Sequence, residues 1–344
     1  MAKRKPGAAW ARLWQQSWST LARSNLRAGS RAAAKALKPA SALMRRQRPP
    51  GDGDWLAGAV IGAAGMRRYW LYRPPGLQPR PGEPLPLLVM LHGCGQTAHG
   101  FATSTRMNRV AAREGFLVLY PEQDRLANAQ GCWNWFDTRS GRAYHEAALI
   151  LQAVDQVCRL YPADRDRVAV AGLSAGASMA ALLATRHPEC FKAVVMHSGI
   201  PPGTAHSGLS AVGAMQGRRP SLPSGPALGQ PDWPPLLVIH GSGDAVVAPT
   251  NGQAAARVWA EAAGAAAAQP RSVQRGQRYP SLVTDFKRGG ATVASLVEVG
   301  GLGHAWSGGA AGQPFGDGRG PDASRLVWAF AARQFRLLAT DKVR

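Results

Sequence analysis

The stretch that most constrains the fold is residues 167–179, where an apolar run leads through Gly172-Leu-Ser-Ala-Gly176 into an alanine- and leucine-rich segment. A Gly-x-Ser-x-Gly pattern between a strand and a helix is typical of a nucleophile elbow, which presents a serine on a sharp turn. The glycines are needed because the backbone is strained there and the two elements approach closely. We therefore predict that Ser174 is a catalytic nucleophile at a helix N-terminus. The alternative is an incidental serine on a glycine turn.

Apolar runs alternate with helical patterns along most of the chain. Five runs are mostly apolar, as expected for strands buried on both faces of a parallel sheet. They lie at 85–91, 116–120, 193–196, 235–240 and 294–299, with an edge strand at 66–73. Helical patterns lie at 104–114, 145–160, 251–263 and 322–338. This alternation predicts a doubly wound, mostly parallel α/β sheet in one catalytic domain over 66–338.

Three segments fall outside this alternation. Residues 51–65 are interpreted as a linker that leads into the catalytic domain. The stretches 200–234 and 264–280 are expected to be loop insertions, because long segments of Gly, Pro, Ser and Ala without periodicity are typical of surface excursions. The first of them has room for one short helix at about 204–217.

The N-terminal extension, residues 1–50, carries 12 lysines and arginines and no acidic residue, within a chain of 344 residues and net charge +21. Five of its apolar residues fall on one face of a helix: Trp10, Leu13, Trp14, Trp18 and Leu21. A basic, tryptophan-rich amphipathic helix favours binding to an anionic or apolar surface such as a membrane. A disordered basic tail is the alternative, and nucleic acid is the less favoured partner. The extension lacks the apolar core of a secretory signal, so the location of the protein is left open.

Polar residues that follow the predicted strands supply candidates for a base and an acid. Catalytic groups in such sheets gather at the carboxyl ends of the strands. Asp244 follows the strand at 235–240, and His304 follows the strand at 294–299. The chain order Ser, acid, His is that of α/β-hydrolases, so we predict a triad of Ser174, Asp244 and His304.

Other residues compete for these roles. Asp285 or Glu298 could replace Asp244 as the acid, whereas Asp232 precedes its strand and is less favoured. His92 precedes the nucleophile and suits an oxyanion loop better than the role of base. His197 follows Ser174 too closely in the chain and is expected to form hydrogen bonds within the core.

Two backbone amides are candidates for the oxyanion hole, which needs two N–H donors. One is the amide of Ala175, directly after the nucleophile, and the other is the amide of Cys94 in the loop after the strand at 85–91. A nucleophilic Cys94 thiol is the alternative, but no base or helix N-terminus is evident to activate it. A Cys94–Cys132 disulfide is one of the pairings left open, while Cys158 is better read as a buried thiol.

Aromatic residues gather in the loops on the same side of the predicted sheet. Trp133, Asn134, Trp135 and Trp306 are the candidates for a substrate-binding wall along an acyl or ester chain. The alternative is that these side chains fold back onto the core.

Five segments, taken together and in order, resemble the polyhydroxybutyrate depolymerase family of esterases, which is also similar to feruloyl esterases. They are Leu91-His-Gly-Cys-Gly-Gln96, Gly131-Cys-Trp-Asn-Trp-Phe136, Gly172-Leu-Ser-Ala-Gly176, His240-Gly-Ser-Gly-Asp244 and Gly303-His-Ala-Trp306. The resemblance covers about residues 66–338. It implies the α/β-hydrolase fold, the triad of Ser174, Asp244 and His304, attack on esters of 3-hydroxyacids, and a secreted, extracellular protein.

We therefore expect a carboxylic ester hydrolase that forms an acyl-enzyme and needs neither a metal nor an organic cofactor. Its expected substrate is a poly- or oligo-3-hydroxybutyrate-type ester. Three alternatives remain open. They are an acyltransferase on the same triad, a feruloyl-type esterase, and a weakly catalytic protein that docks through residues 1–50 on polyester granules, membranes or nucleic acid.

Overall fold

The structure is a computed structural model that describes residues 51–76, 83–218 and 233–341. The N-terminal extension, 1–50, for which the sequence favours an amphipathic helix, lies outside the described residues, as do residues 219–232 of the expected insertion. Within the described ranges, no helix is both long enough and apolar enough to cross a membrane.

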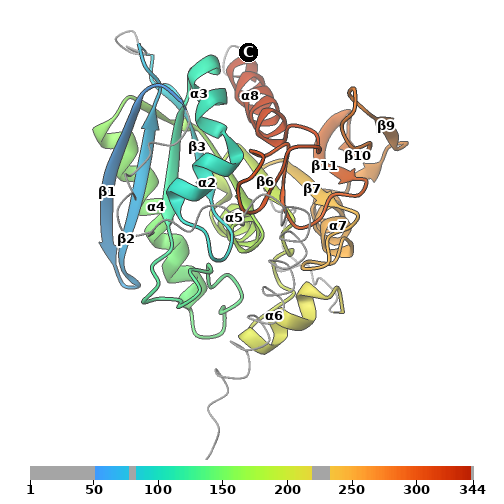
Figure 1. Ribbon diagram of the computed structural model, residues 1–344, viewed down its shortest axis with the longest axis horizontal. Coiled ribbons are helices and arrows are strands. Elements are labelled where there is room, and N and C mark those ends of the chain that lie inside the picture. The colour runs from blue at the N-terminus through green and yellow to red at the C-terminus, as the bar shows by residue number, and fades with distance from the viewer. Residues whose placement is uncertain (1–50, 77–82, 219–232, 342–344) are drawn as a thin grey trace, which may run out of the picture. The chain divides into compact units, whose positions relative to one another are not determined.

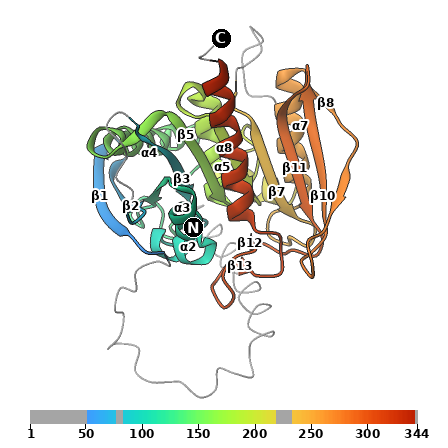
Figure 2. The ribbon, with the colours of Figure 1, turned by 90° about the horizontal axis from the view of Figure 1, so that it is seen from above.

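A twisted sheet with helices on both faces lies at the centre of the described residues (Figures 1 and 2). Its strand order is β1-β2-β4-β3-β5-β6-β7-β11-β10-β8, and β9 pairs with β10. The strands from β4 to β11 in that order pair in parallel, whereas β1, β2 and β10 extend the sheet with antiparallel pairings. The mostly parallel, doubly wound sheet predicted from the sequence is confirmed.

The bounds of the elements are as follows. The strands are β1 (Asp54–Gly62), β2 (Gly65–Arg73), β3 (Leu85–Leu91), β4 (Leu117–Glu122), β5 (Ala163–Leu173), β6 (Ala193–His197), β7 (Leu236–Gly241), β8 (Ala266–Ala267), β9 (Arg271–Val273), β10 (Ser281–Arg288), β11 (Ala291–Val299), β12 (Trp306–Ser307) and β13 (Gly316–Asp317). The helices are α2 (Ala98–Thr105), α3 (Met107–Glu114), α4 (Arg142–Leu160), α5 (Ala175–Arg186), α6 (Gly208–Met215), α7 (Thr250–Ala263) and α8 (Ala323–Asp341).

Helices cover both faces of the sheet, with α2, α3 and α8 on one face and α4, α5 and α7 on the other (Figure 2). On the first face, Phe101, Met107 and Val327 pack against Met90 and Val195 in one buried cluster. Because the central strands are covered on both sides, their buried stretches are mostly apolar, and this is why they could be recognised in the sequence.

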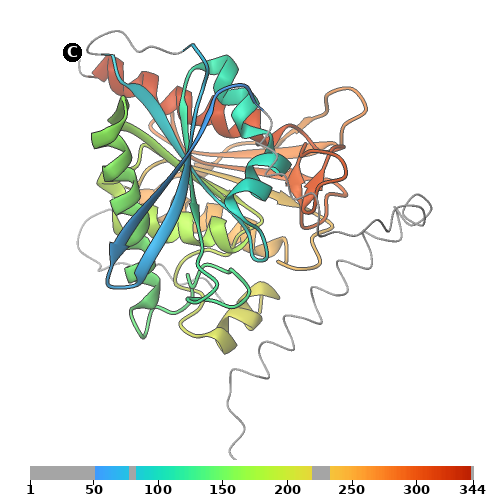
Figure 3. The same cartoon turned by 60° about the vertical axis from the view of Figure 1, so that its left-hand side comes forward.

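The sequence-based expectation of a linker at 51–65 has to be corrected, because most of this segment forms β1. This strand pairs with β2 in an antiparallel hairpin along one edge of the sheet (Figure 3). Trp55 stacks on Trp70 with ring centroids 5.5 Å apart, and Asp54 forms an ion pair with Arg73. These contacts were not predicted from the sequence, because the glycines of the segment suggested a linker and not a strand. As a result β2, predicted to be the edge strand, is the second strand of the sheet.

Two further elements differ from the sequence-based expectation. The helix expected at 104–114 is two helices, α2 and α3, which meet at Arg106 in the left-handed conformation (φ 56°). Strand β10 was missed because it is amphipathic, with Ser281, Val283 and Asp285 alternating with residues of the other face. The short helix expected within 200–234 is present as α6, while 264–280 contains the short strands β8 and β9.

Candidate active site

The turn between β5 and α5 is the strained elbow that the sequence predicts. Ser174 is the N-cap of α5 and has φ 56° and ψ −119°, a conformation that costs a residue with a side chain of the order of 1–3 kcal/mol. A Cβ atom on Gly172 would overlap the backbone of Gly176, and one on Gly176 would overlap the carbonyl oxygens of Leu91 and His92 at the end of β3. Both glycines are therefore required by close backbone approach.

The elbow is tied to the neighbouring strand. The Ser174 amide donates a hydrogen bond to the His197 carbonyl at the end of β6, with a donor–acceptor distance of 2.9 Å. This bond fixes the strained residue from the side opposite to β3. The serine hydroxyl is thus presented at the carboxyl edge of the sheet by two strands that flank β5.

Asp244 and His304 are brought together from two loops that follow β7 and β11. His304 Nδ1 lies 2.8 Å from Asp244 Oδ2. The other carboxylate oxygen, Oδ1, accepts hydrogen bonds from the amides of Val246 and Val247 at 3.0 and 2.9 Å. The two loops meet closely because Gly241 has no side chain, since a Cβ there would overlap the Leu302 carbonyl.

The surroundings of Asp244 keep its carboxyl group ionised. Burial raises its pKa, but the nearby His304 and His240 outweigh burial and hold that pKa well below its ordinary value. His240 Nε2 lies 3.5 Å from Asp244 Oδ2 and 3.0 Å from the Val247 carbonyl. The contact between His240 and Asp244 was not predicted, because His240 lies within a strand. The spacing of four residues between them is the feature of the sequence that could have indicated it.

His304 has the free nitrogen that a base needs. With Nδ1 bound to Asp244, its second ring nitrogen, Nε2, is buried and has no hydrogen-bond partner among the described residues. The loop that carries His304 also contacts the elbow region, because the Ser307 amide donates to His197 Nε2 at 3.0 Å. The triad role of the three residues remains a prediction, to which this geometry lends support.

The competing histidines are engaged elsewhere. Burial, with His240 and His304 nearby, lowers the pKa of His197 to about 3, so its ring is neutral and its single acceptor nitrogen is occupied by Ser307. Burial also lowers the pKa of His92 to about 4, and its Nε2 accepts from the Gln123 amide at 3.0 Å. Neither ring has a lone pair left for a substrate proton.

The loop after β3 lies beside the nucleophile. A Cβ on Gly93 would lie 3.6 Å from that of Ser174. Gly93 is held at both ends, because its amide donates to Gln96 Oε1 and its carbonyl accepts from His92 Nδ1, both at 2.8 Å. In a trans peptide the following N–H points away from that carbonyl. The amide of Cys94 is therefore directed away from His92 and, like that of Ala175, has no hydrogen-bond partner in the described ranges.

A disulfide joins the two loops next to the site. Cys94 and Cys132 are bonded, whereas Cys158 and Cys190 are free and partly buried. The pairing left open by the sequence is thereby resolved, and the Cys94 sulfur is not available as a nucleophile. Burial raises the pKa of the Cys158 thiol to about 11, which keeps it protonated and unreactive.

The residues expected to form an aromatic wall are buried, and their contact with a substrate remains a prediction. Trp133, Asn134 and Trp306 are 0–2% exposed, and their polar groups are already engaged. Trp133 Nε1 donates to the His92 carbonyl and Trp306 Nε1 to Ser324 Oγ, both at 3.0 Å. Trp133 thus holds the loop after β3, and Trp306 stacks on His197. Trp135 is also buried, at 7% exposure.

A buried charged network behind this loop was missed in the sequence. Glu146 of α4 accepts hydrogen bonds from the Asn134 amide and from the side chains of Asn134 and Gln123, at 2.6–2.9 Å. Its counter-charge is Arg67 of β2, which is fully buried, 3.9 Å from Glu146 and stacked over Trp133. The sequence contains one indication of this network. Arg67 lies on the same face of its strand as Tyr69 and Leu71, which are buried.

We predict that Glu146→Gln lowers the free energy of unfolding by about 3–5 kcal/mol, because it leaves the buried Arg67 cation without its counter-charge. Urea unfolding followed by circular dichroism measures this change. Combining Glu146→Gln with Arg67→Met removes the buried charge and should restore part of the stability. If the single and double variants unfold at the same urea concentration, the ion pair is not the source of the effect.

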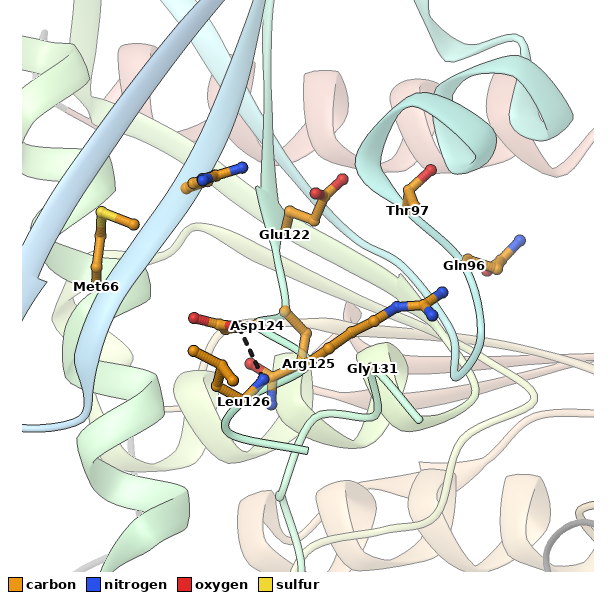
Figure 4. A pocket seen from close by; sticks show the side chains of 10 residues that line it. Met66, Gln96, Thr97, Glu122, Asp124, Arg125, Leu126 and Gly131 are labelled. Carbon is orange, nitrogen blue, oxygen red and sulfur yellow. Dashed lines mark hydrogen bonds between the residues drawn. The ribbon is translucent and has the colours of Figure 1, made fainter. Parts of the chain in front are cut away.

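A cavity of about 310 Å³ adjoins the loop after β3 (Figure 4). Seven of its ten lining residues are polar or charged: Arg68, Gln96, Thr97, Glu122, Gln123, Asp124 and Arg125, with Met66, Leu126 and Gly131. The Asp124 carboxylate accepts from the Leu126 amide at 2.9 Å and so shapes the outer loop. Because Gln96 also binds the Gly93 amide, this cavity shares a wall with the nucleophile region.

Comparison with known sequences gives a consistent result. The family described as esterase PHB depolymerase matches residues 67–270. Poly(3-hydroxyalkanoate) depolymerase C of Paucimonas lemoignei is 35% identical over 178 residues, which cover 48% of this chain and 42% of that protein. Probable acetylxylan esterase A of Aspergillus fumigatus is 27% identical over 224 residues, covering 60% and 57%. The chain therefore spans about half the length of these curated relatives.

Solved structures share the same architecture. The acetyl xylan esterase from Aspergillus awamori superposes with a TM-score of 0.58 and 21% sequence identity, over 73% of this chain and 94% of that one. At this identity the likeness concerns the fold, which is the α/β-hydrolase fold that the resemblance implied.

Proposed function

Because the chain belongs to the esterase PHB depolymerase family, we propose that it is a serine esterase in which Ser174, His304 and Asp244 form the catalytic triad. The observation that carries the proposal is the 2.8 Å contact between His304 Nδ1 and Asp244 Oδ2, which leaves His304 Nε2 without a hydrogen-bond partner among the described residues. A serine hydroxyl becomes a useful nucleophile only when such a base removes its proton.

The reaction follows from these groups. Ser174 Oγ attacks the ester carbonyl carbon while His304 Nε2 takes up the hydroxyl proton, and Asp244 stabilises the imidazolium. The amides of Cys94 and Ala175 donate to the oxyanion that develops on the carbonyl oxygen. His304 then returns the proton to the leaving alcohol, and an acyl-enzyme remains. Water, deprotonated by His304, attacks the acyl group and releases the carboxylic acid together with free Ser174.

The loop architecture suits this role because the donors are fixed before substrate binds. The Cys94 amide is oriented by the two hydrogen bonds of Gly93 and by the Cys94–Cys132 disulfide. Donors that need no reorientation during the reaction stabilise the transition state most effectively.

For the substrate we propose esters of 3-hydroxyacids, supported by the relative named poly(3-hydroxyalkanoate) depolymerase C. A second candidate is an ester of a carbohydrate, supported by the polar side chains that line the cavity next to the loop after β3. The side chains of Gln96, Glu122 and Asp124 in that cavity offer the acceptors and donors that sugar hydroxyls bind (Figure 4).

A hydrolysis panel tests both the activity and the substrate class. It compares p-nitrophenyl butyrate, trimers of 3-hydroxybutyrate, the hydroxybutyrate polymer, acetylated xylan and methyl ferulate. We expect kcat/KM for the hydroxybutyrate trimer to exceed that for acetylated xylan by at least about tenfold, which corresponds to about 1.4 kcal/mol. The reverse order would favour the carbohydrate ester, and failure on every ester would refute the proposed activity.

A further inference from the structure

A large groove lies between helix α8 and the end of the sheet that β10 and β11 form. Helix α8 packs against β5, β6 and β7, whereas β10 and β11 continue beyond it, and the ribbons separate there (Figure 2). The cavity between them has a volume of about 720 Å³. The sheet residues at its floor, Leu237, Val283 and Val297, are 5–9% exposed, so the groove reaches down to the edge of the core.

The floor and one wall of the groove are largely apolar. Val283 of β10 pairs with Val297 of β11, and these side chains face the groove together with Leu237 of β7. Opposite them, Leu326, Ala329 and Phe330 lie at helical spacing along one stripe of α8. An elongated aliphatic chain can thus contact apolar atoms on both sides.

The rim of the groove is cationic. The lining holds five arginines but only two carboxylates: Arg271, Arg275, Arg278, Arg325 and Arg333, with Asp285 and Asp322. Both carboxylates are already engaged, Asp285 with Arg271 and Ser295, and Asp322 with Arg325.

Two of the rim arginines are uncommitted. Arg278 donates to the carbonyl of Gly320, so three of the five are held by protein groups. The guanidinium groups of Arg275 and Arg333 have no hydrogen bond or ion pair to any residue in the described ranges. They come from the β9–β10 connection and from α8, and both line the groove.

We propose that this groove binds an aliphatic carboxylate, with the chain between the Val283–Val297 pair and Phe330 and the carboxylate at Arg275 and Arg333. Planar guanidinium groups match a carboxylate in two-pronged hydrogen bonds, and the apolar floor explains why a chain should accompany the charge. No triad residue lines the groove, so the site is separate from the catalytic centre and does not depend on the function proposed above.

Dodecanoate, used below its micellar concentration, is the probe, and isothermal titration calorimetry on the full chain is the measurement. We expect the double variant Arg275→Gln/Arg333→Gln to weaken dodecanoate binding by at least about tenfold, as is usual when charge-assisted hydrogen bonds are lost. Ala329→Trp, at an exposed position of the α8 stripe, should block the chain and weaken binding similarly. Arg159→Gln, an exposed arginine of α4, is the matched control and should bind as the unchanged protein does.

Two further readouts distinguish binding in this groove from binding at the catalytic centre. They also distinguish it from a site that recognises only an apolar chain or only an anion. Hydrolysis of p-nitrophenyl butyrate should be equal in all four proteins, and dodecanol should bind the unchanged protein at least about tenfold more weakly than dodecanoate. The proposal is overturned if dodecanoate binds equally to the unchanged protein and to both groove variants, which would place it at the catalytic centre or elsewhere. Equal binding of dodecanol, or equally tight binding of inorganic phosphate, would overturn it as well.

Discussion

Replacing Ser174 with alanine is expected to lower kcat for p-nitrophenyl butyrate by about 10⁴- to 10⁶-fold, the range seen when a nucleophile is removed from a triad that acts as a unit. The remaining rate would come from the oxyanion amides and from substrate binding alone. The fold should be unaffected. Alanine has the same Cβ atom as serine at φ 56°, and the serine hydroxyl forms no hydrogen bond to the described residues that would be lost.

Two controls make this result specific. Ser178→Ala, one helical turn further along α5, removes a hydroxyl that accepts from the Ile200 amide at 2.8 Å, and should retain activity within about tenfold while losing about 1 kcal/mol of stability. Ser174→Gly should be as inactive as Ser174→Ala yet more stable by about 1 kcal/mol, because glycine relieves the strained conformation. Comparable activity of Ser174→Ala and the unchanged enzyme would exclude Ser174 as the nucleophile.

The elbow and the parallel strands could be predicted because steric demands fix their residue types. No side chain fits at Gly172 or Gly176, so the motif is visible in any sequence that builds this turn. The central strands are covered on both faces and therefore appear as mostly apolar runs. The chain order of Ser174, Asp244 and His304 followed from placing polar residues at strand ends, and the structure brings Asp244 and His304 into contact.

The features that were missed depend on contacts between distant segments. A tryptophan in a loop is recognisable as apolar, but the neighbouring sequence does not indicate whether its ring faces a ligand or the core. In the structure, Trp133 and Trp306 face the core. Likewise β1 and β10 have one exposed face, so their alternation of polar and apolar residues looks like that of a turn-rich segment. The partner of Arg67 lies 79 positions away in α4, beyond the reach of any local pattern.

Asp244→Asn is expected to lower kcat by about 10³- to 10⁴-fold, through the tautomer of His304 rather than through loss of charge alone. The hydrogen bonds of Asp244 determine how an asparagine must sit. The amides of Val246 and Val247 both donate to Oδ1, so the asparagine oxygen has to face them and its NH₂ group has to face His304 Nδ1. That NH₂ group forces Nδ1 to become an acceptor and places the imidazole proton on Nε2. A base in this form cannot take the proton of Ser174.

The pH dependence distinguishes this role from a structural one. Because the pKa of Asp244 is held well below its ordinary value, the carboxylate stays ionised where a histidine base titrates. The acid limb of kcat/KM should therefore have a slope of one, because Asp244 adds no second protonation there. Because the pKa of Asp244 is lower in the folded state, its ionisation stabilises the fold at a pH above about 3.9, the ordinary pKa of an aspartate. This contribution to stability is lost as the pH falls below that value. The difference in free energy of unfolding between the unchanged protein and Asp244→Asn should accordingly be largest at neutral pH and should decrease below about pH 4.

The two other acids that the sequence offered provide the matched controls for Asp244. Asp285 binds Ser295 and Arg271, and Glu298 accepts from Gln253 at 2.8 Å, so neither carboxylate contacts His304. Asp285→Asn and Glu298→Gln should hydrolyse p-nitrophenyl butyrate within about threefold of the unchanged rate, since each is outside the triad. A large loss in either variant, with activity retained in Asp244→Asn, would move the acid to that residue. It would leave the 2.8 Å contact between Asp244 and His304 as a structural bond only.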